Sequence, residues 1–208
     1  MTLDKIALEA KTDKASDGHN YTRVYEKYLE PLRNEPLLIF EVGIGGYQYP
    51  DRGGQSLRMW ERYFPNAKIV GIDVYPKEGM GTDRIHIEHG SQDNPDFLAS
   101  LVNKYGAPDL IVDDASHVNK LTIRTFEILF PMLKPGGLYF CEDIHTSFWL
   151  QDYGGDPDPA ARTTTLAYFQ HLTAQLSHDT LQTDYRNQFA GHLDFMHFYR
   201  NLVILKKL

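Results

Sequence analysis

The stretch from Leu37 to Trp60, LLIFEVGIGGYQYPDRGGQSLRMW, decides the fold. It begins with a short apolar run that ends in Glu41, continues into a glycine-rich turn and closes with a helix-like segment. Short apolar runs are typical of strands buried on both faces, and glycines directly after such a strand let the backbone turn tightly and approach a ligand. The stretch therefore predicts the first strand, turn and helix of a nucleotide-binding α/β fold.

The positions of the acids indicate which kind of nucleotide binds at this turn. A dinucleotide site has the pattern GxGxxG with an acid about 20 residues later. Here Glu41 precedes the glycines, and the next acid at a strand end, Asp73, comes much further along the chain. A glycine turn can also be a plain connection between a strand and a helix. The two acids favour an adenosine-bearing, positively charged ligand over that interpretation.

Strand-like and helix-like segments alternate through the rest of the chain. The apolar runs predict strands over 37–42, 67–73, 84–88, 108–112, 138–142, 193–199 and 202–206. The helical periodicity predicts helices over 21–33, 54–63, 96–105, 120–133 and 166–177. Alternation of this kind is typical of a parallel sheet with right-handed crossovers, and the final pair of strands adds one antiparallel hairpin.

Length and composition predict one domain over residues 1–208. The net charge of −7 argues against a nucleic-acid or anionic-membrane surface, both of which need a basic footprint. No apolar run approaches the roughly 18 residues of a membrane span. The single cysteine, Cys141, excludes an internal disulfide, and no secretory signal is recognisable. Small polar substrates stay open, and we expect a cytoplasmic protein.

Acidic residues gather where the fourth and fifth predicted strands end. The fourth strand runs into Asp113-Asp114-Ala-Ser-His117, and the fifth runs into Glu142-Asp143. Since the carboxyl ends of central strands face the ligand crevice of an open α/β sheet, Asp114, Glu142 and Asp143 can converge there. Clustered carboxylates repel one another unless a cation neutralises them, and Mg²⁺ prefers oxygen ligands. The alternative is that Asp113 or Asp114 caps the next helix and that Glu142 and Asp143 only solvate a loop.

His117 is the candidate general base because it follows Asp114 by three residues. An imidazole whose unperturbed pKa is about 6.5 is suited to accept a proton from a hydroxyl near neutral pH. A histidine near a helix start is otherwise more often a surface or capping residue. His145, which adjoins the acid pair, is the next candidate for the base.

The ordered set of motifs resembles a known enzyme family. The glycine turn and Asp73 are similar to those of class I S-adenosylmethionine (AdoMet) methyltransferases. Nearly the whole chain resembles the metal-dependent sugar O-methyltransferases of macrolide and related natural-product pathways. The segments that carry this resemblance are Thr12-Asp-Lys14, His19-Asn-Tyr21, Glu41 to Tyr47, Gly53 to Trp60, Gly71-Ile-Asp73, Asp113 to His117 and Glu142-Asp143.

The resemblance implies a single-domain, Rossmann-like class I methyltransferase of the α/β class. Its seven-stranded, mostly parallel sheet would have the order 3-2-1-4-5-7-6, with helices on both faces. The implied cofactors are AdoMet and Mg²⁺, with Asp114, Glu142 and Asp143 as magnesium ligands and His117 as the base. The implied AdoMet-binding residues are Glu41, Gly43, Gly45, Gly46, Ser56, Asp73, Ser91, Gln92, Asp93 and Asp113. Ser56 can equally be a plain residue of a helix start.

The implied reaction is methyl transfer from AdoMet to a hydroxyl of a sugar or glycosylated natural product, with a vicinal diol as the acceptor. A catechol or another small diol is the alternative acceptor. A non-catalytic AdoMet-binding protein would not need the acidic cluster, and a nucleotide-dependent oxidoreductase is disfavoured by the acid before the turn. The expected partner is thus a small-molecule glycoside, with neither nucleic acid nor membrane involved.

Three further expectations concern the loops and the assembly. Residues 1–36 are expected to form an N-terminal helical flap over the cofactor. Residues 144–165, rich in Gly, Asp and Pro, are longer than most connections and are expected to form a substrate lid. The chain departs from the family by lacking an additional N-terminal domain that helps to build the oligomer, which leaves a homo-oligomer open. Aromatic residues in the loops can stack on a sugar or polyketide face or be anchored locally: Tyr47, Tyr49, Phe148, Trp149 and Tyr153.

Overall fold

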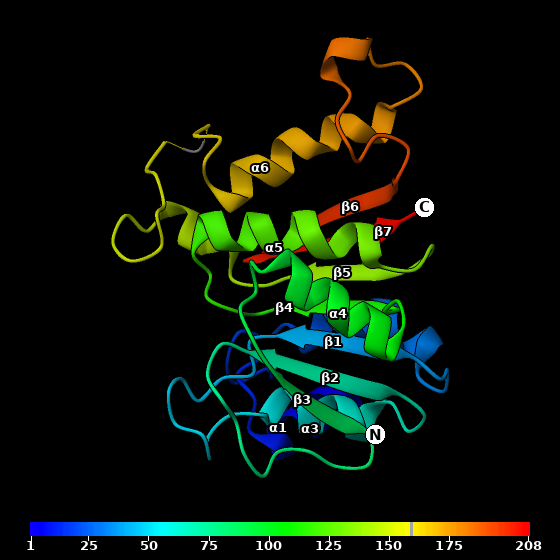
Figure 1. The fold of residues 1–208 in the computed structure, drawn as a ribbon, viewed down its shortest axis with the longest axis vertical. Helices are drawn as coiled ribbons and strands as arrows, with labels where there is room; N and C mark the ends of the chain where they lie inside the picture. Colours follow the sequence, from blue (N-terminus) through cyan, green and yellow to red (C-terminus); the bar gives the residue numbers. More distant parts are fainter. Residues whose placement is uncertain (159) are drawn as a thin grey trace. The chain divides into compact units, whose positions relative to one another are not determined.

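A computed structural model of the protein describes residues 1–158 and 160–208 (Figure 1). The chain forms two compact units, Met1–Ser91 and Gln92–Leu208. Each unit has its own strands, helices and buried apolar side chains. Within the described residues, no helix has both the length and the apolar character that crossing a membrane requires.

The first unit alternates helices with parallel strands. Its elements are α1 (Leu3–Ala10), α2 (Thr22–Leu29), the 3₁₀ helix η1 (Glu30–Leu32), β1 (Leu38–Val42), α3 (Gln55–Tyr63), β2 (Lys68–Asp73) and β3 (Ile85–His89). Helices α1 and α3 lie behind β2 and β3 in the view of Figure 1. Helix α1 was not predicted, although Thr2 caps it by accepting a 3.3 Å hydrogen bond from the Lys5 amide.

The register of β1, β2 and β3 places the glycine turn beside Asp73. All five residues of β1 are buried, as the apolar run predicts. Strands β1 and β2 pair in parallel with Val42 opposite Ile72, and β2 and β3 pair in parallel with Asp73 opposite His89. The carboxyl ends of β1 and β2 therefore meet at one edge. Helix α3 packs closely on β2, because a Cβ on Gly71 would lie 2.8 Å from Leu57 Cδ1.

The second unit contains parallel strands that end in an antiparallel hairpin. Its elements are α4 (Pro95–Tyr105), β4 (Leu110–Asp113), α5 (Asn119–Met132), β5 (Leu138–Cys141), the 3₁₀ helix η2 (Ile144–Phe148), α6 (Thr165–Leu172), the 3₁₀ helices η3 (Thr173–Ser177) and η4 (Thr183–Tyr185), β6 (Leu193–Tyr199) and β7 (Leu202–Lys207). Strands β4 and β5 pair in parallel, and β7 pairs antiparallel with both β5 and β6.

Aromatic packing around α5 builds the core of the second unit. The Phe126 ring of α5 makes an edge contact with Tyr139 of β5 at 5.2 Å between centroids and another with Phe169 of α6 at 5.0 Å. In Figure 1, α5 accordingly runs between β5 and α6. This packing positions α5. The first residue of α5, Asn119, follows directly on the loop that carries His117.

The strand order is β3-β2-β1-β4-β5-β7-β6, which confirms the predicted topology. Some boundaries were wrong. Strand β4 reaches Asp113, and the helix predicted over 166–177 changes to 3₁₀ geometry after Leu172. The segment 144–148 was predicted as loop but forms η2, because it contains no Gly, Asp or Pro and these residues come only after position 150.

Candidate active site

The turn after β1 has a backbone conformation that only glycine adopts easily. Gly43, Gly45 and Gly46 have φ values of +84°, +73° and +81°, in the left-handed region that other residues rarely adopt. The Gly43 amide donates to the Ile72 carbonyl at 2.8 Å, which closes the turn onto the neighbouring strand β2. A Cβ on Gly46 would lie 2.0 Å from the Arg52 carbonyl oxygen. The backbone thus passes close to itself at this point, as the sequence predicts for a tight βα turn.

Asp73 lies at the end of β2 and is only 8% exposed. Its Oδ2 accepts a 3.2 Å hydrogen bond from the Ile44 amide, and its Oδ1 accepts a 2.8 Å hydrogen bond from the Tyr75 amide. A carboxylate has about four lone-pair positions, so two amides leave capacity for further donors. Asp73 is therefore a fixed, ionisable acceptor beside the glycine turn, where a pair of ribose hydroxyls can be bound.

Glu41, by contrast, points to groups inside its own unit. The carboxylate is fully buried, with the Lys14 Nζ 3.7 Å from Oε1 and the Trp60 indole N–H donating to Oε2 at 3.1 Å. Lys14 is also fully buried, so the segment Thr12-Asp-Lys14 is fastened to β1 by this ion pair. The flap over residues 1–36 and a direct contact of Glu41 with the cofactor stay predictions.

The other predicted cofactor residues lie in three places. Ser56 is the second residue of α3 and is buried. Ser91 ends the first unit, and Gln92 and Asp93 begin the second. Gln92 uses its side chain within the second unit, where Oε1 accepts from the Ser116 amide at 3.2 Å and Nε2 donates to Thr125 Oγ1 at 2.8 Å. It supports the loop after β4, and its role in binding AdoMet stays a prediction.

Two acids and an imidazole come together at the ends of β4 and β5. His117 Nε2 lies 3.7 Å from Asp114 Oδ1 and 3.5 Å from Asp143 Oδ2, and one ligand atom from each of the three residues lies within 4.8 Å of the others. His145 Nδ1 lies 3.8 Å from Asp143 Oδ1. Because the side chains offer oxygen and nitrogen atoms to one point, they fit a single divalent cation.

The backbone of this group is held in an uncommon conformation. His117 and Asp143 have φ values of +55° and +52°, which cost free energy for residues other than glycine. The Thr146 hydroxyl of η2 lies 2.9 Å from the His117 carbonyl oxygen and 3.1 Å from the Asp143 carbonyl oxygen. Thr146 is buried, so one hydroxyl ties together the two residues with positive φ. Sequence reasoning missed Thr146, whose only signal is its position three residues after Asp143.

Glu142 is not among the described side chains whose ligand atoms lie within 4.8 Å of one another. It is buried, its amide donates to the Asp113 carbonyl at 3.0 Å, and among the described residues the potential metal group consists of Asp114, His117 and Asp143. The structure thus brings together two of the three predicted carboxylates and adds the predicted base. The roles of Glu142 as a ligand and of His117 as a base stay predictions.

Asp113 is bound within the second unit. It is 2% exposed, and the Tyr139 hydroxyl donates to its Oδ2 at 2.7 Å. The pKa of Asp113 is raised to about 7: burial is the main cause, the nearby charge of Asp114 adds to the rise, and the Tyr139 hydrogen bond opposes it. Burial also raises the pKa of the Cys141 thiol, and the surrounding acids add to that shift. The predicted contact of Asp113 with AdoMet stays a prediction.

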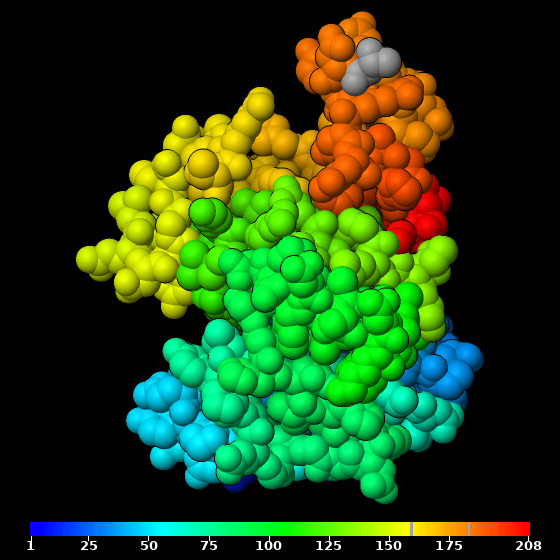
Figure 2. Space-filling view, viewed as in Figure 1, coloured from blue at the N-terminus to red at the C-terminus, as the bar shows by residue number. Residues whose placement is uncertain are grey.

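The helix-capping interpretation of the two aspartates is wrong. Helix α5 begins after Val118, so the cap position belongs to Val118 and not to an aspartate, and Val118 makes no side-chain capping hydrogen bond. Asn119, its first residue, instead fastens the following loop: its Nδ2 donates to the Tyr153 carbonyl at 2.9 Å and its Oδ1 accepts from the Thr165 amide at 2.7 Å. Figure 2 shows the yellow segment after η2 at the surface of the second unit. A substrate lid over 144–165 stays a prediction. Asn119 contacts this segment at Tyr153 and at its last residue, Thr165.

Comparisons with known proteins support the functional interpretation. No protein-family model matches the chain. A 3'-O-methyltransferase of 8-demethyl-8-(2-methoxy-alpha-L-rhamnosyl)-tetracenomycin C from Streptomyces olivaceus is 38% identical over 209 residues, which cover 99% of this chain and 53% of that protein. Mycinamicin VI 2''-O-methyltransferase from Micromonospora griseorubida is 34% identical over 210 residues, which cover 99% of this chain and 52% of that protein.

The chain is therefore similar in sequence to two sugar O-methyltransferases over nearly its whole length. A crystal structure of the MycE methyltransferase with Mg and SAH has a TM-score of 0.94 and 32% identity to the chain, and the match covers 100% of this chain and 53% of that one. This similarity confirms the predicted methyltransferase fold. The chain spans about half the length of the curated relatives it matches.

Proposed function

We propose that the protein transfers a methyl group from AdoMet to a hydroxyl of a sugar or glycosylated natural product, with the aid of Mg²⁺. The observation that carries the proposal is the group Asp114, His117 and Asp143 in a homologue of sugar O-methyltransferases. Two curated relatives act on rhamnosyl tetracenomycins, and MycE has been crystallised with Mg, SAH and mycinamycin VI. A small-molecule glycoside is therefore the expected acceptor.

The first unit is proposed to bind AdoMet through the glycine turn and Asp73. Bound AdoMet supplies a methyl group on a positively charged sulfur, which makes it a strong electrophile. Asp73, held by two amides, accepts the ribose hydroxyls, and the glycines of the turn let the backbone approach the methionine portion. The remaining proposed contacts are Glu41, Ser56, Ser91, Gln92, Asp93 and Asp113. Of these, Glu41, Gln92 and Asp113 also have the protein partners described above.

The second unit is proposed to hold Mg²⁺ through Asp114 and Asp143, with Glu142 as a third carboxylate. The donor set fits, because two carboxylates lie within reach of one another and oxygen atoms are the ligands that Mg²⁺ prefers. At this site Mg²⁺ would supply a Lewis acid that orients neighbouring hydroxyls and lowers the pKa of the reacting one. Imidazole suits other divalent metals better than it suits Mg²⁺, which favours a different role for His117.

His117 is proposed to accept the proton of the reacting hydroxyl at Nε2. The two aspartates at 3.5 and 3.7 Å from this nitrogen would stabilise the charge that the ring gains with the proton, and Thr146 holds the backbone that carries it. Positioned proton transfer is a common role of histidine near neutral pH. His145, close to the other oxygen of Asp143, is the alternative base.

Two other functions remain as outcomes of the test. A catechol or another small diol would present the same pair of hydroxyls. A non-catalytic AdoMet-binding protein would have no use for the acids at the ends of β4 and β5. A cytoplasmic location and assembly into a homo-oligomer are proposed from the sequence alone.

The test is methyl transfer by the purified protein. AdoMet and Mg²⁺ are supplied with a panel of rhamnosides, other vicinal-diol glycosides and catechols, and products are detected by mass spectrometry. We expect a product one methyl group heavier with at least one glycoside. Transfer to catechols alone would overturn the acceptor class. Binding of S-adenosylhomocysteine without transfer to any acceptor would favour the non-catalytic function.

A further inference from the structure

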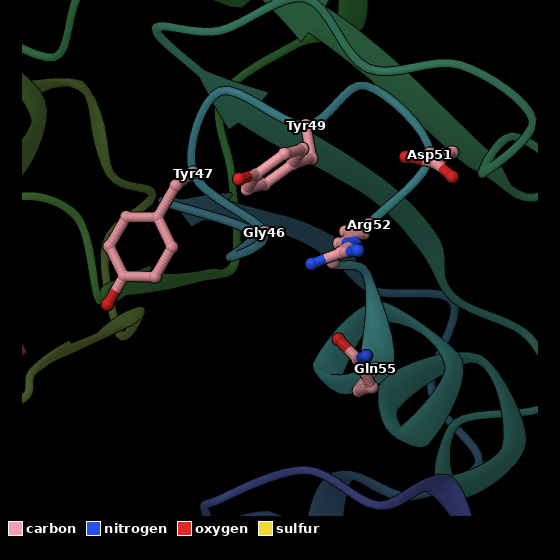
Figure 3. A pocket seen from close by; sticks show the side chains of 7 residues that line it. Gly46, Tyr47, Tyr49, Asp51, Arg52 and Gln55 are labelled. Atoms are coloured by element: carbon pink, nitrogen blue, oxygen red, sulfur yellow. The ribbon is translucent and has the colours of Figure 1, made fainter.

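The loop that follows the glycine turn surrounds an open hollow on the first unit. The hollow has a volume of about 450 Å³, and its lining includes Tyr47, Tyr49, Arg52 and Gln55. Figure 3 shows the Tyr47 ring projecting to one side of the loop, with Tyr49, Arg52 and Gln55 along the rest of the hollow. In Figure 2, the light-blue segment near residue 50 lies at the surface of the first unit. The hollow is thus accessible to a small molecule.

The loop is closed at its base by two glycines. A Cβ on Gly53 would lie 2.4 Å from the Gly45 carbonyl oxygen, and a Cβ on Gly46 would lie 2.0 Å from the Arg52 carbonyl oxygen. The two backbone segments at the base of the loop, 45–46 and 52–53, are therefore in close contact. This contact fixes the points where the loop begins and ends.

Lys77 holds the loop from inside. Its Nζ lies 2.5 Å from the Tyr47 carbonyl oxygen, 3.2 Å from that of Tyr49 and 3.3 Å from that of Arg52. An ammonium group has three N–H donors, and here three carbonyl groups of one short loop receive them. The Glu78 amide adds a 2.9 Å hydrogen bond to the Pro50 carbonyl. The loop is thereby preorganised, which lowers the entropy cost of binding a ligand to it.

Tyr47 has a conformation that burial does not explain. Its φ is +48°, which is strained for a tyrosine, and its side chain is 78% exposed. A ring that projects into solvent gains little from packing, so stability of the fold is a poor reason for a strained tyrosine. Strained backbone that the surroundings enforce is a feature of binding and catalytic sites.

The side chains of the hollow suit a sugar. Arg52 stacks over the Tyr49 ring at 4.4 Å, and stacking leaves the in-plane N–H groups of the guanidinium pointing outward. A rigid tyrosine ring offers a large contact area with little loss of conformational entropy, and Gln55 offers both a donor and an acceptor. An apolar ring face together with planar polar groups matches a pyranose, which has C–H bonds on its faces and hydroxyls around its edge.

We propose that this hollow is a binding subsite for the glycoside acceptor, in which Tyr47 stacks on a sugar ring and Arg52 and Gln55 bind its hydroxyls. Lys77 is the positioning residue that keeps Tyr47 in place. The inference rests on the proposed function, because it takes a glycoside to be the acceptor.

The test measures binding of p-nitrophenyl α-L-rhamnoside by saturation-transfer NMR and titration. Tyr47→Ala should weaken the complex about tenfold or more, as loss of a central aromatic contact usually does. Tyr47→Phe keeps the ring and should bind within about threefold of the wild type, because only the hydroxyl is lost. Lys77→Met should weaken binding by an intermediate factor, since the loop loses the three hydrogen bonds that the ammonium group donates to it.

Matched controls separate the subsite from general effects. Tyr185→Ala removes another exposed tyrosine, and Lys68→Met removes a lysine on the exposed first residue of β2; both should bind like the wild type. The Tyr47 variants and both controls should keep their melting temperature, and all variants should keep their affinity for S-adenosylhomocysteine, measured by calorimetry.

Two results would overturn the proposal: unchanged affinity in Tyr47→Ala, or no saturation transfer from the wild type to the sugar protons. Failure of the proposed function gives a different pattern. In that case the wild type binds the rhamnoside through Tyr47 but transfers no methyl group to any acceptor.

Discussion

The two units both place acids at the ends of parallel strands, but they surround these acids differently. In the first unit, Glu41 is paired with Lys14 and Trp60, and Asp73 accepts two backbone amides. In the second unit, the imidazole of His117 lies 3.7 Å from Asp114 and 3.5 Å from Asp143, and that of His145 lies 3.8 Å from Asp143. The first unit surrounds its acids with a lysine, an indole and backbone amides, whereas the second places imidazoles beside its acids.

This difference separates two kinds of binding. An acid held by permanent donors is well positioned for neutral hydroxyls, such as those of a ribose, and needs no added ion. Acids gathered around imidazoles keep their mutual repulsion whenever the imidazoles are neutral, so they favour a divalent cation. We therefore expect the acid at the end of β2 to bind hydroxyl groups and the acids after β4 and β5 to bind a divalent cation.

Removal of the metal should have the largest effect on turnover. EDTA should abolish methyl transfer and Mg²⁺ should restore it, because the acids of the second unit require a cation. Asp114→Asn and Asp143→Asn should each lower Mg²⁺ affinity about a hundredfold or more, a larger loss than removing an outer partner of a ligand causes. Glu142→Gln tests the third carboxylate. An equal loss of Mg²⁺ affinity would assign Glu142 as a ligand, and a small loss would limit the site to Asp114, His117 and Asp143. Full activity in EDTA would remove the metal from the account.

Loss of the proposed base should have the next largest effect. His117→Ala should lower kcat by about 10²- to 10⁴-fold, the usual contribution of a general base. Affinity for AdoMet should be near normal, because the first unit is untouched. Higher pH should partly restore the rate, which steady-state kinetics across pH would reveal. A variant with the wild-type rate at neutral pH would transfer the role to His145.

Loss of the ribose acceptor should affect the first unit alone. Asp73→Ala removes a charged acceptor worth about 1.5 to 3 kcal/mol per hydrogen bond, so S-adenosylhomocysteine should bind at least about tenfold more weakly. Asp73→Asn, which keeps the shape and one carbonyl oxygen, should show a smaller loss. Calorimetry that finds the same affinity in Asp73→Ala and the wild type would contradict the assignment.

The smallest effect is expected at Thr146. Thr146→Val keeps the shape but removes the hydroxyl that lies between the His117 and Asp143 carbonyls, so the rate and the Mg²⁺ affinity should fall about tenfold, as expected for one buried hydrogen bond. Thr146→Ser restores the hydroxyl and should recover most of the loss. If Val and Ser variants behave alike in both measurements, the hydroxyl does not position the group.

The local features of the fold could be predicted from the sequence, and the side-chain partners could not. The apolar runs before Glu41 and Asp73 identify β1 and β2, because strand pattern and glycine turns are local signals. Two examples are the ion pair of Lys14 with Glu41 and the contacts of Lys77 with the Tyr47 loop. These residues are far apart in the chain, and the sequence of one segment does not indicate its partner.

The composition of the acidic group shows the same limit. Glu142 and Asp143 are adjacent and look equivalent in the sequence. Asp143 reaches His117 with its own φ at +52°, a conformation that depends on η2 and Thr146. Because η2 lies in a segment that was predicted as loop, the sequence could not distinguish the two acids.

The most direct test of the contrast between the units is a pair of titrations on the same purified samples. Binding of S-adenosylhomocysteine and of Mg²⁺ is measured by calorimetry for the wild type, Asp73→Ala and Asp143→Asn. We predict that Asp73→Ala weakens only S-adenosylhomocysteine, by about tenfold or more, and that Asp143→Asn weakens only Mg²⁺. Loss of both ligands in either variant, or wild-type Mg²⁺ affinity in Asp143→Asn, would contradict the account.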